Sequence, residues 1–309
     1  MNTPISVGGQ AVLEGVMMRS PRNMTVAVRT PSGEIAMKRD PLKLLSDSWR
    51  FLKWPVVRGT VTLFSSLALG MKALNFSAEC AMEDEKKGAD EAPDKGVWTD
   101  IMMGATMVFS LGVGLLLFFY LPLQLTELLK DVIPATRESS LAFNLVDGVI
   151  RVIIFLAYIA AITRMKDIRR VFEYHGAEHK AIYAYEAGGE LTVESARKYP
   201  RLHPRCGTSF LLVVMVLSIL VFSFIPKDAL LYEKALARLA LIPLVAGLSY
   251  EFIKFSARKK ENRLVSALVR PGLWLQNLTT REPSDDQIEV AISALKEALR
   301  MEEGKYEVA

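Results

Sequence analysis

The sequence predicts a mainly α-helical, polytopic membrane protein with about four transmembrane helices, a small N-terminal β element on the cytoplasmic side and a cytoplasmic metal-binding loop. Three observations lead to this prediction. Of the 309 residues, 51% are hydrophobic, which exceeds the content of an ordinary soluble domain of this length. The apolar residues are gathered in blocks with few charges. All three histidines lie within 29 positions of one another, close to one of only two cysteines.

Residues 1–60 are expected to form the β element and an interfacial segment. Two β-prone runs, Thr25–Arg29 and Glu34–Lys38, flank a Thr-Pro-Ser-Gly turn. Aromatic and cationic residues are mixed at 49–55, as in a segment that lies on a membrane surface. The glycine-containing stretch at 8–15 lacks the Lys-Ser or Lys-Thr ending of a phosphate loop. We therefore expect its glycines to allow tight backbone packing.

Residues 61–82 are expected to form an amphipathic or re-entrant helix, and residues 83–97 a flexible linker. Val61–Ala78 is apolar, but Lys72 and several hydroxyl side chains interrupt it; a fifth span is the alternative. The following stretch is charged, contains Gly88 and Pro93 and has no apolar period, which is typical of a linker.

The transmembrane domain is expected at 98–260, with spans at 101–121, 141–163, 208–225 and 235–255. The first and third are uncharged and long enough to cross a hydrocarbon layer of about 30 Å. The second contains Asp147 and Arg151, whose spacing allows an ion pair that lowers the cost of burying either charge. We favour a structural pair over a polar path toward the site. The fourth span carries Arg238, Pro243 and Glu251.

The basic residues predict the orientation. Segments 1–100 and 164–207 hold 13 and 9 Lys or Arg residues, whereas loops 122–140 and 226–234 hold 2 each. The positive-inside rule then places both termini and the 164–207 loop in the cytoplasm of a cell with an inner membrane. The lipid bilayer is the expected partner, and nucleic acid is not, because the net charge of +4 follows from this bias. No cleavable signal peptide is recognised.

The segment 261–309 is expected to be a cytoplasmic tail that contains an amphipathic helix. Ser284 is a candidate N-cap, and apolar residues follow it at helical spacing. Earlier in the chain, residues 170–187 suit a helix that ends at Gly188.

His175, Glu178 and His179 form an H-x-x-E-H sequence, the order found in inverted zinc proteases. Residues four apart on a helix have Cβ atoms about 5–6 Å apart, so both imidazoles can reach one metal ion. Glu178 is then placed to act as the catalytic general base. Zinc is the expected metal, because calcium or magnesium would require more oxygen ligands.

His203 and Cys206 are the candidates for the remaining ligands, since imidazole and thiolate both suit zinc. If all four donors bind, the site is closed and structural; if three bind, water can take the fourth position and the site is catalytic. Glu251 is a secondary candidate for the third ligand. The alternative for Glu251 is an ion pair with Lys254 or another cation of the basic tail.

These residues predict a zinc-dependent integral membrane hydrolase that acts on a membrane-associated substrate at the cytoplasmic boundary. The alternative is a non-enzymatic scaffold or biogenesis factor with a structural zinc site, which would bind a membrane-protein partner. A transporter is less favoured, because the spans offer few polar groups for a conduit.

Four motifs, in order along the chain, resemble the YqhQ-like family of bacterial membrane proteins. They are Val7–Val12 with Glu14–Arg19, Glu173–Lys180, His203–Phe210 and Pro271–Gln276. The resemblance covers nearly the whole chain. It implies a metal-dependent enzyme of the inner membrane and names no substrate or reaction.

Overall fold

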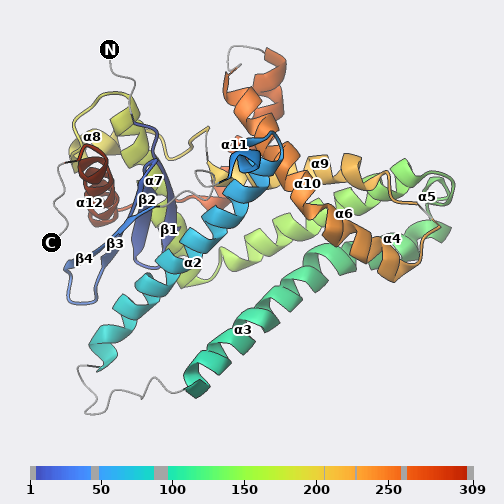
Figure 1. The fold of residues 1–309 in the computed structure, drawn as a ribbon, viewed down its shortest axis with the longest axis horizontal. Helices are drawn as coiled ribbons and strands as arrows, with labels where there is room; N and C mark the ends of the chain where they lie inside the picture. Colours follow the sequence, from blue (N-terminus) through green and yellow to red (C-terminus); the bar gives the residue numbers. More distant parts are fainter. Residues whose placement is uncertain are drawn as a thin grey trace.

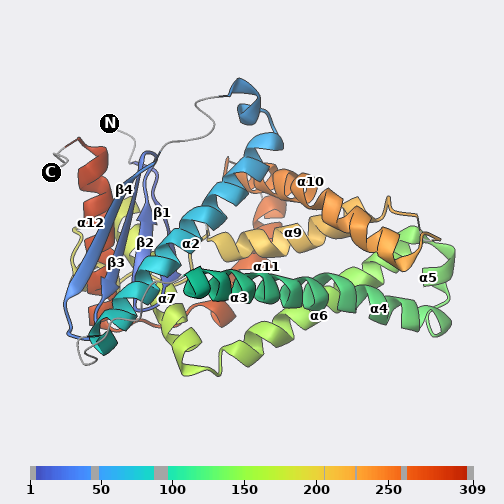
Figure 2. The same cartoon turned by 60° about the horizontal axis from the view of Figure 1, so that its bottom comes forward.

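A computed structural model describes residues 5–42, 49–86, 97–204, 206–226, 228–258 and 263–304, and Figures 1 and 2 show it in two orientations. The strands are β1 (Gly8–Val12), β2 (Gly15–Arg19), β3 (Asn23–Arg29) and β4 (Ile35–Pro41). The helices are η1 (Arg50–Lys53), α2 (Val57–Lys86), α3 (Val97–Leu115), η2 (Leu116–Tyr120), α4 (Leu121–Leu128), η3 (Leu129–Asp131), α5 (Ala135–Glu138), α6 (Ser140–Ile162), α7 (Lys166–Glu186), α8 (Val193–Arg197), α9 (Gly207–Phe222), α10 (Leu231–Arg258), α11 (Arg263–Thr279) and α12 (Asp285–Glu302).

The predicted N-terminal β element is a four-stranded antiparallel sheet in the order β1-β2-β3-β4. The two predicted β-prone runs are β3 and β4, and two further strands precede them. Two residues connect β1 to β2, and one of them, Glu14, has a φ of 52°. Strands β1 and β4 therefore form the two open edges of the sheet.

Helices cover both faces of this sheet and build a compact lobe around it (Figure 2). Val16, Met18 and Ala27 pack on one face against α7 and α12. Val12 and Met17 pack on the other face against α2. The alternation of strand side chains between the two faces explains why the strands are buried on both sides. The N-terminal sheet and the C-terminal α12 thus share one hydrophobic core, which the sequence alone did not predict.

Three helices are long and apolar enough to cross a membrane: Gly104–Asp131, Ser140–Ile162 and Leu231–Ser256. They correspond to the first, second and fourth predicted spans. The predicted span 208–225 forms the shorter apolar helix α9, so the count of four stays a prediction. The segment 61–78 lies inside α2, which does not meet the same length and composition criteria within the described residues.

The structure also describes several of the connecting segments. The linker predicted at 83–97 lies mostly outside the described residues, and its described ends belong to α2 and α3. Most of the predicted 164–207 loop is helical, with α7 close to the helix predicted at 170–187. The predicted tail helix is α12, and Ser284 forms a capping box with Gln287 at its start.

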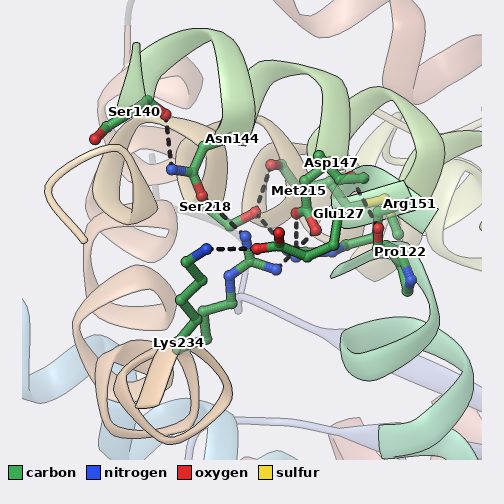
Figure 3. Close-up of polar contacts among 11 residues, drawn as sticks. Pro122, Glu127, Ser140, Asn144, Asp147, Arg151, Met215, Ser218 and Lys234 are labelled. Atoms are coloured by element: carbon green, nitrogen blue, oxygen red, sulfur yellow. Dashed lines mark hydrogen bonds and ion pairs between the residues drawn. The ribbon is translucent and has the colours of Figure 1, made fainter. Parts of the chain in front are cut away.

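A buried polar network joins α4, α6 and α10 in the helical bundle (Figure 3). Asp147 accepts hydrogen bonds from Arg151 and Arg238, each at 2.7 Å, and all three side chains are buried. Lys234 pairs with Glu127 at 2.5 Å. The predicted Asp147–Arg151 pair is therefore present, and Arg238 from the fourth predicted span extends it into a contact between helices.

Candidate metal centre

The two histidines of the H-x-x-E-H motif lie one turn apart in the middle of α7. Their ring centroids are 4.5 Å apart. The helix ends at Glu186, and Ala187 is its C-cap; the next residue, Gly188, adopts a φ of 70°, a conformation that favours glycine and stops a helix. Helical spacing thus produces the pair that the sequence predicted.

Cys206 brings a third donor to the histidine pair from the N-cap position of α9. Its Sγ lies 3.2 Å from His175 Nε2 and accepts a hydrogen bond from the Thr208 backbone N–H. Ligand atoms of His175, His179 and Cys206 all lie within 4.8 Å of one another, and the last two side chains are buried. Among the described residues, these three therefore form a compact donor cluster.

The other ring nitrogens of both histidines bind backbone carbonyl groups. His175 Nδ1 lies 2.8 Å from the Thr279 carbonyl oxygen, and His179 Nδ1 lies 2.5 Å from that of Arg201. A carbonyl oxygen can only accept, so each Nδ1 carries the proton and, in the neutral ring, Nε2 keeps its lone pair. Metal-bound histidines are usually held by this type of second hydrogen bond.

The donor set fits zinc. Zinc–nitrogen and zinc–sulfur bonds of about 2.0 and 2.3 Å in a tetrahedron separate the two donor atoms by about 3.5 Å. The observed distance between His175 Nε2 and Cys206 Sγ is 3.2 Å. The distance between these two donor atoms is therefore close to the distance in a tetrahedral zinc site.

His203 lies beside the cluster rather than in it. Its ring centroid is 5.6 Å from that of His179, and its Nε2 is 3.5 Å from a Glu186 carboxylate oxygen. Gln276 fixes the backbone of His203 through two hydrogen bonds of 2.8 Å. The structure thus brings together three of the four predicted donors.

Glu178 is almost completely buried, with 5% of its surface exposed. Burial raises the pKa of its carboxyl group to about 7, although the charge of His175 and a hydrogen bond from the Gly9 backbone N–H both act in the opposite direction. A Cβ atom built on Gly9 would lie 2.7–2.9 Å from the Glu178 side chain. Gly9 therefore gives the carboxylate room, in agreement with the close backbone packing predicted for this stretch.

A cavity of about 670 Å³ opens beside this cluster, a size typical of small-molecule and cofactor sites. His175, Glu178 and Cys206 line one part of its wall, while residues of β1, α2, α9 and α10 line other parts. Leu67 and Leu211 also line it, and 56% and 43% of their surfaces are exposed. The cavity is thus mostly apolar and lies where the lobe meets the helical bundle.

The structure does not place Glu251 in the donor cluster. Its carboxylate accepts two hydrogen bonds from Arg58, one of them from Nε at 2.6 Å. The ion pair considered as the alternative is therefore present, but its cation comes from α2 and not from the basic tail. This partner was not predictable, because 193 residues separate the two positions.

The comparisons with known proteins agree with the motifs described above. Residues 54–301 match the family model described as "Protein of unknown function (DUF1385)". The chain belongs to this family. The Bacillus subtilis (strain 168) protein named "Uncharacterized protein YqhQ" is 35% identical over 303 residues, which cover 97% of this chain and 94% of the relative. The match confirms the resemblance to the YqhQ-like family, and no solved structure matches the chain.

In this DUF1385 chain, sequence reasoning missed the groups that orient the predicted ligands. The carbonyl oxygens of Thr279 and Arg201 hold the two imidazoles, and the Gly9 N–H holds the Glu178 carboxylate. Backbone groups leave no residue-type signal in a sequence. The pair of glycines at 8–9 was the only visible trace of the last contact.

Proposed function

We propose that the protein is an integral membrane hydrolase that holds zinc through His175, His179 and Cys206. One observation supports this proposal most strongly: the three donors lie together beside a cavity, and two of them, His175 and Cys206, share its wall with the buried carboxyl group of Glu178. Three protein donors leave a fourth position of a tetrahedral ion for water or substrate, as in catalytic zinc sites.

A bound zinc ion would polarise the reacting carbonyl or phosphoryl group and lower the pKa of a water molecule toward about 7. Glu178 would accept a proton from that water at its carboxylate and pass it to the leaving group. The Gly9 N–H holds the carboxylate in position, and the two backbone carbonyls hold the imidazoles. Such fixed geometry is what a general base requires.

The first experiment measures metal content. The purified wild-type protein should contain one zinc per chain, and X-ray absorption should report one sulfur ligand and three nitrogen or oxygen ligands, of which two show the multiple scattering of imidazole. His179→Ala should lose the metal, whereas Glu178→Gln should keep it and lose turnover. A metal-free wild-type protein, or a Glu178→Gln variant with full activity, would contradict the proposal.

A second candidate is a thiol hydrolase that needs no metal. The contact between Cys206 Sγ and His175 Nε2 favours it, because Thr279 orients the imidazole and Cys206 caps the N-terminus of α9. His179 distinguishes the two chemistries, since it belongs only to the metal site. Activity that survives His179→Ala and is abolished by iodoacetamide would favour the thiol mechanism.

The structural zinc site of a scaffold protein needs His203 as a fourth protein donor. His203→Ala is therefore the matched variant for His179→Ala. If the protein is the hydrolase, the His203→Ala variant should still bind zinc, with water in the fourth position of the ion. An absorption spectrum with the multiple scattering of three imidazole ligands and one sulfur ligand in the wild type would favour the scaffold instead.

The proposal includes four membrane crossings with both termini in the cytoplasm. The sheet, α7 and α12 share one hydrophobic core, so they lie on one side of the membrane. The chain must then cross an even number of times between the sheet and α7, and again between α7 and α12. The long helices Gly104–Asp131 and Ser140–Ile162 supply the first pair, and α9 joins α10 in the second. The basic residues support the cytoplasmic side for this lobe.

A further inference from the structure

The open edge of β1 carries backbone groups that point away from the sheet. The Arg29 N–H of β3 donates to the carbonyl of Glu14, the residue before β2. Because the direction of the backbone N–H and C=O groups alternates along a strand, those of the even-numbered residues of β2 also point toward β3. The odd-numbered residues of β2 consequently pair with Gly8, Gln10 and Val12 of β1. The N–H and C=O groups of Gly9 and Ala11 must therefore point to the open edge.

This open edge faces the cavity of the proposed active site. Gly9, Gln10 and Ala11 all line the cavity. The Gly9 N–H already donates to Glu178, as the alternation requires. Among the described residues, no protein group bonds to the N–H or the C=O of Ala11 at this edge.

An unpaired strand edge of this kind is a template for another extended chain. The N–H and C=O groups at alternate residues of β1 can form hydrogen bonds with the C=O and N–H groups of a second strand. A lipid acyl chain has no hydrogen-bonding groups to offer. Gly8 and Gly9 carry no side chains that would keep a second backbone away. The apolar wall formed by Leu67 and Leu211 suits apolar side chains.

We infer that the substrate is a polypeptide segment that binds in extended form as an additional strand on β1. This inference rests on the proposed hydrolase for its chemistry, and it makes the bond to be cleaved a peptide bond. A peptide on this edge passes next to Glu178, which lies against Gly9, and therefore passes along the wall that contains His175 and Cys206.

Binding can be tested without turnover on the full-length protein in lipid nanodiscs. The probe is a pool of nine-residue peptides made of Ala, Val, Leu and Ile, with a photoreactive leucine at the centre and a lysine at each end for solubility. Ultraviolet crosslinking followed by mass spectrometry should label residues of β1, α2 and α7 at the cavity. The same pool with every backbone nitrogen methylated should give little labelling, because methylation then removes the N–H donors from both edges of the new strand.

Ala11→Pro removes the outward N–H without disturbing the β1–β2 ladder, since proline is tolerated at such edge positions. It should reduce labelling by roughly three- to tenfold, the loss expected for one hydrogen bond. Met37→Pro is the matched control, because Met37 has the corresponding outward position on the opposite edge, β4. Met37→Pro should label as the wild type does.

The remaining outcomes separate this inference from the proposed function. Equal labelling by the methylated and unmethylated pools, or by Ala11→Pro and the wild type, would overturn the inference. Labelling of the cavity by a photoreactive phosphatidylglycerol that displaces the peptides would assign the cavity to lipid instead. If His179→Ala loses zinc and still labels fully, both ideas stand; if the wild type labels but never contains zinc, only the hydrolase chemistry fails.

Discussion

Two adjacent glycines show how much depends on single atoms at the candidate site. A Cβ on Gly9 would lie within 3 Å of Glu178, whereas a Cβ on Gly8 would meet no atom within 4 Å. Both residues belong to β1, and because they are neighbours their Cβ positions point to opposite faces of the sheet. Their side-chain positions therefore offer a matched pair of variants.

Gly9→Ala should force the Glu178 carboxylate out of its position. We expect a loss of about 1–3 kcal/mol in the free energy of unfolding, the usual cost of overpacking, with zinc content unchanged because no ligand is touched. Thermal unfolding and metal analysis measure the two quantities. Gly8→Ala should match the wild type in both, and equal stability of the two variants would contradict the assigned contact.

At the scale of the element, α7 is held against the segment that follows α11. Gly176 lies next to His175, and a Cβ built on it would come within 2.1 Å of the Arg281 carbonyl oxygen. The Arg281 N–H donates to the Phe172 carbonyl at 2.8 Å. This close approach places the Thr279 carbonyl beside the His175 imidazole.

Gly176→Ala should therefore separate α7 from this segment and weaken zinc binding. The clash involves backbone atoms, so we expect it to outweigh the gain in helix propensity of about 1 kcal/mol. Gly112→Ala in α3 is the control, because its Cβ would meet no atom within 4 Å. Zinc affinity measured by competition with a chelator should fall only for Gly176→Ala; unchanged affinity would show that the contact does not position His175.

The buried network between α6 and α10 is a second contact that can be tested at this scale. Asp147→Asn leaves Arg151 and Arg238 without their shared carboxylate. Removal of one partner from a buried ion pair costs about 3–5 kcal/mol, which denaturant unfolding in detergent should detect. Asp131→Asn, in an exposed pair with Arg137, should change stability by less than about 1 kcal/mol. Similar losses in both variants would argue against a structural role for the network.

At the scale of the whole molecule, the sheet and α12 share one core and must lie on the same side of the membrane. The number of membrane crossings between them is therefore expected to be even. Ser32→Cys and Glu303→Cys lie on the lobe, and Asp228→Cys lies between α9 and α10. With four crossings, a membrane-impermeant maleimide should label only Asp228→Cys in intact cells. Labelling of Ser32→Cys and Glu303→Cys should require permeabilised membranes, and labelling of only one of these two in intact cells would mean an odd number of crossings.

The sequence predicted the positions of helices and strands better than the contacts between residues that lie far apart in the chain. The positions of the three long apolar helices, of β3 and β4, of α7 and of α12 followed from hydropathy, periodicity and capping residues, because those signals are local. The partner of Glu251 and the extension of the Asp147–Arg151 pair to Arg238 did not follow, because residues far apart in the chain supply them. The position of His203 outside the cluster likewise depends on Gln276 from a distant helix.

By itself, the amino-acid sequence determined that this chain is mainly helical, with helices long and apolar enough to cross a membrane and a histidine pair on one helix face. Apolar length and a four-residue spacing suffice for these two features. Only the tertiary structure decided which donors meet, because the N-terminal end of α9 brings Cys206 to His175, which lies 31 residues away in the chain. It also decided that the open edge of β1 lies along the same cavity. Backbone hydrogen bonds and long-range packing fix that arrangement, and neither depends on a residue pattern that can be recognised in advance.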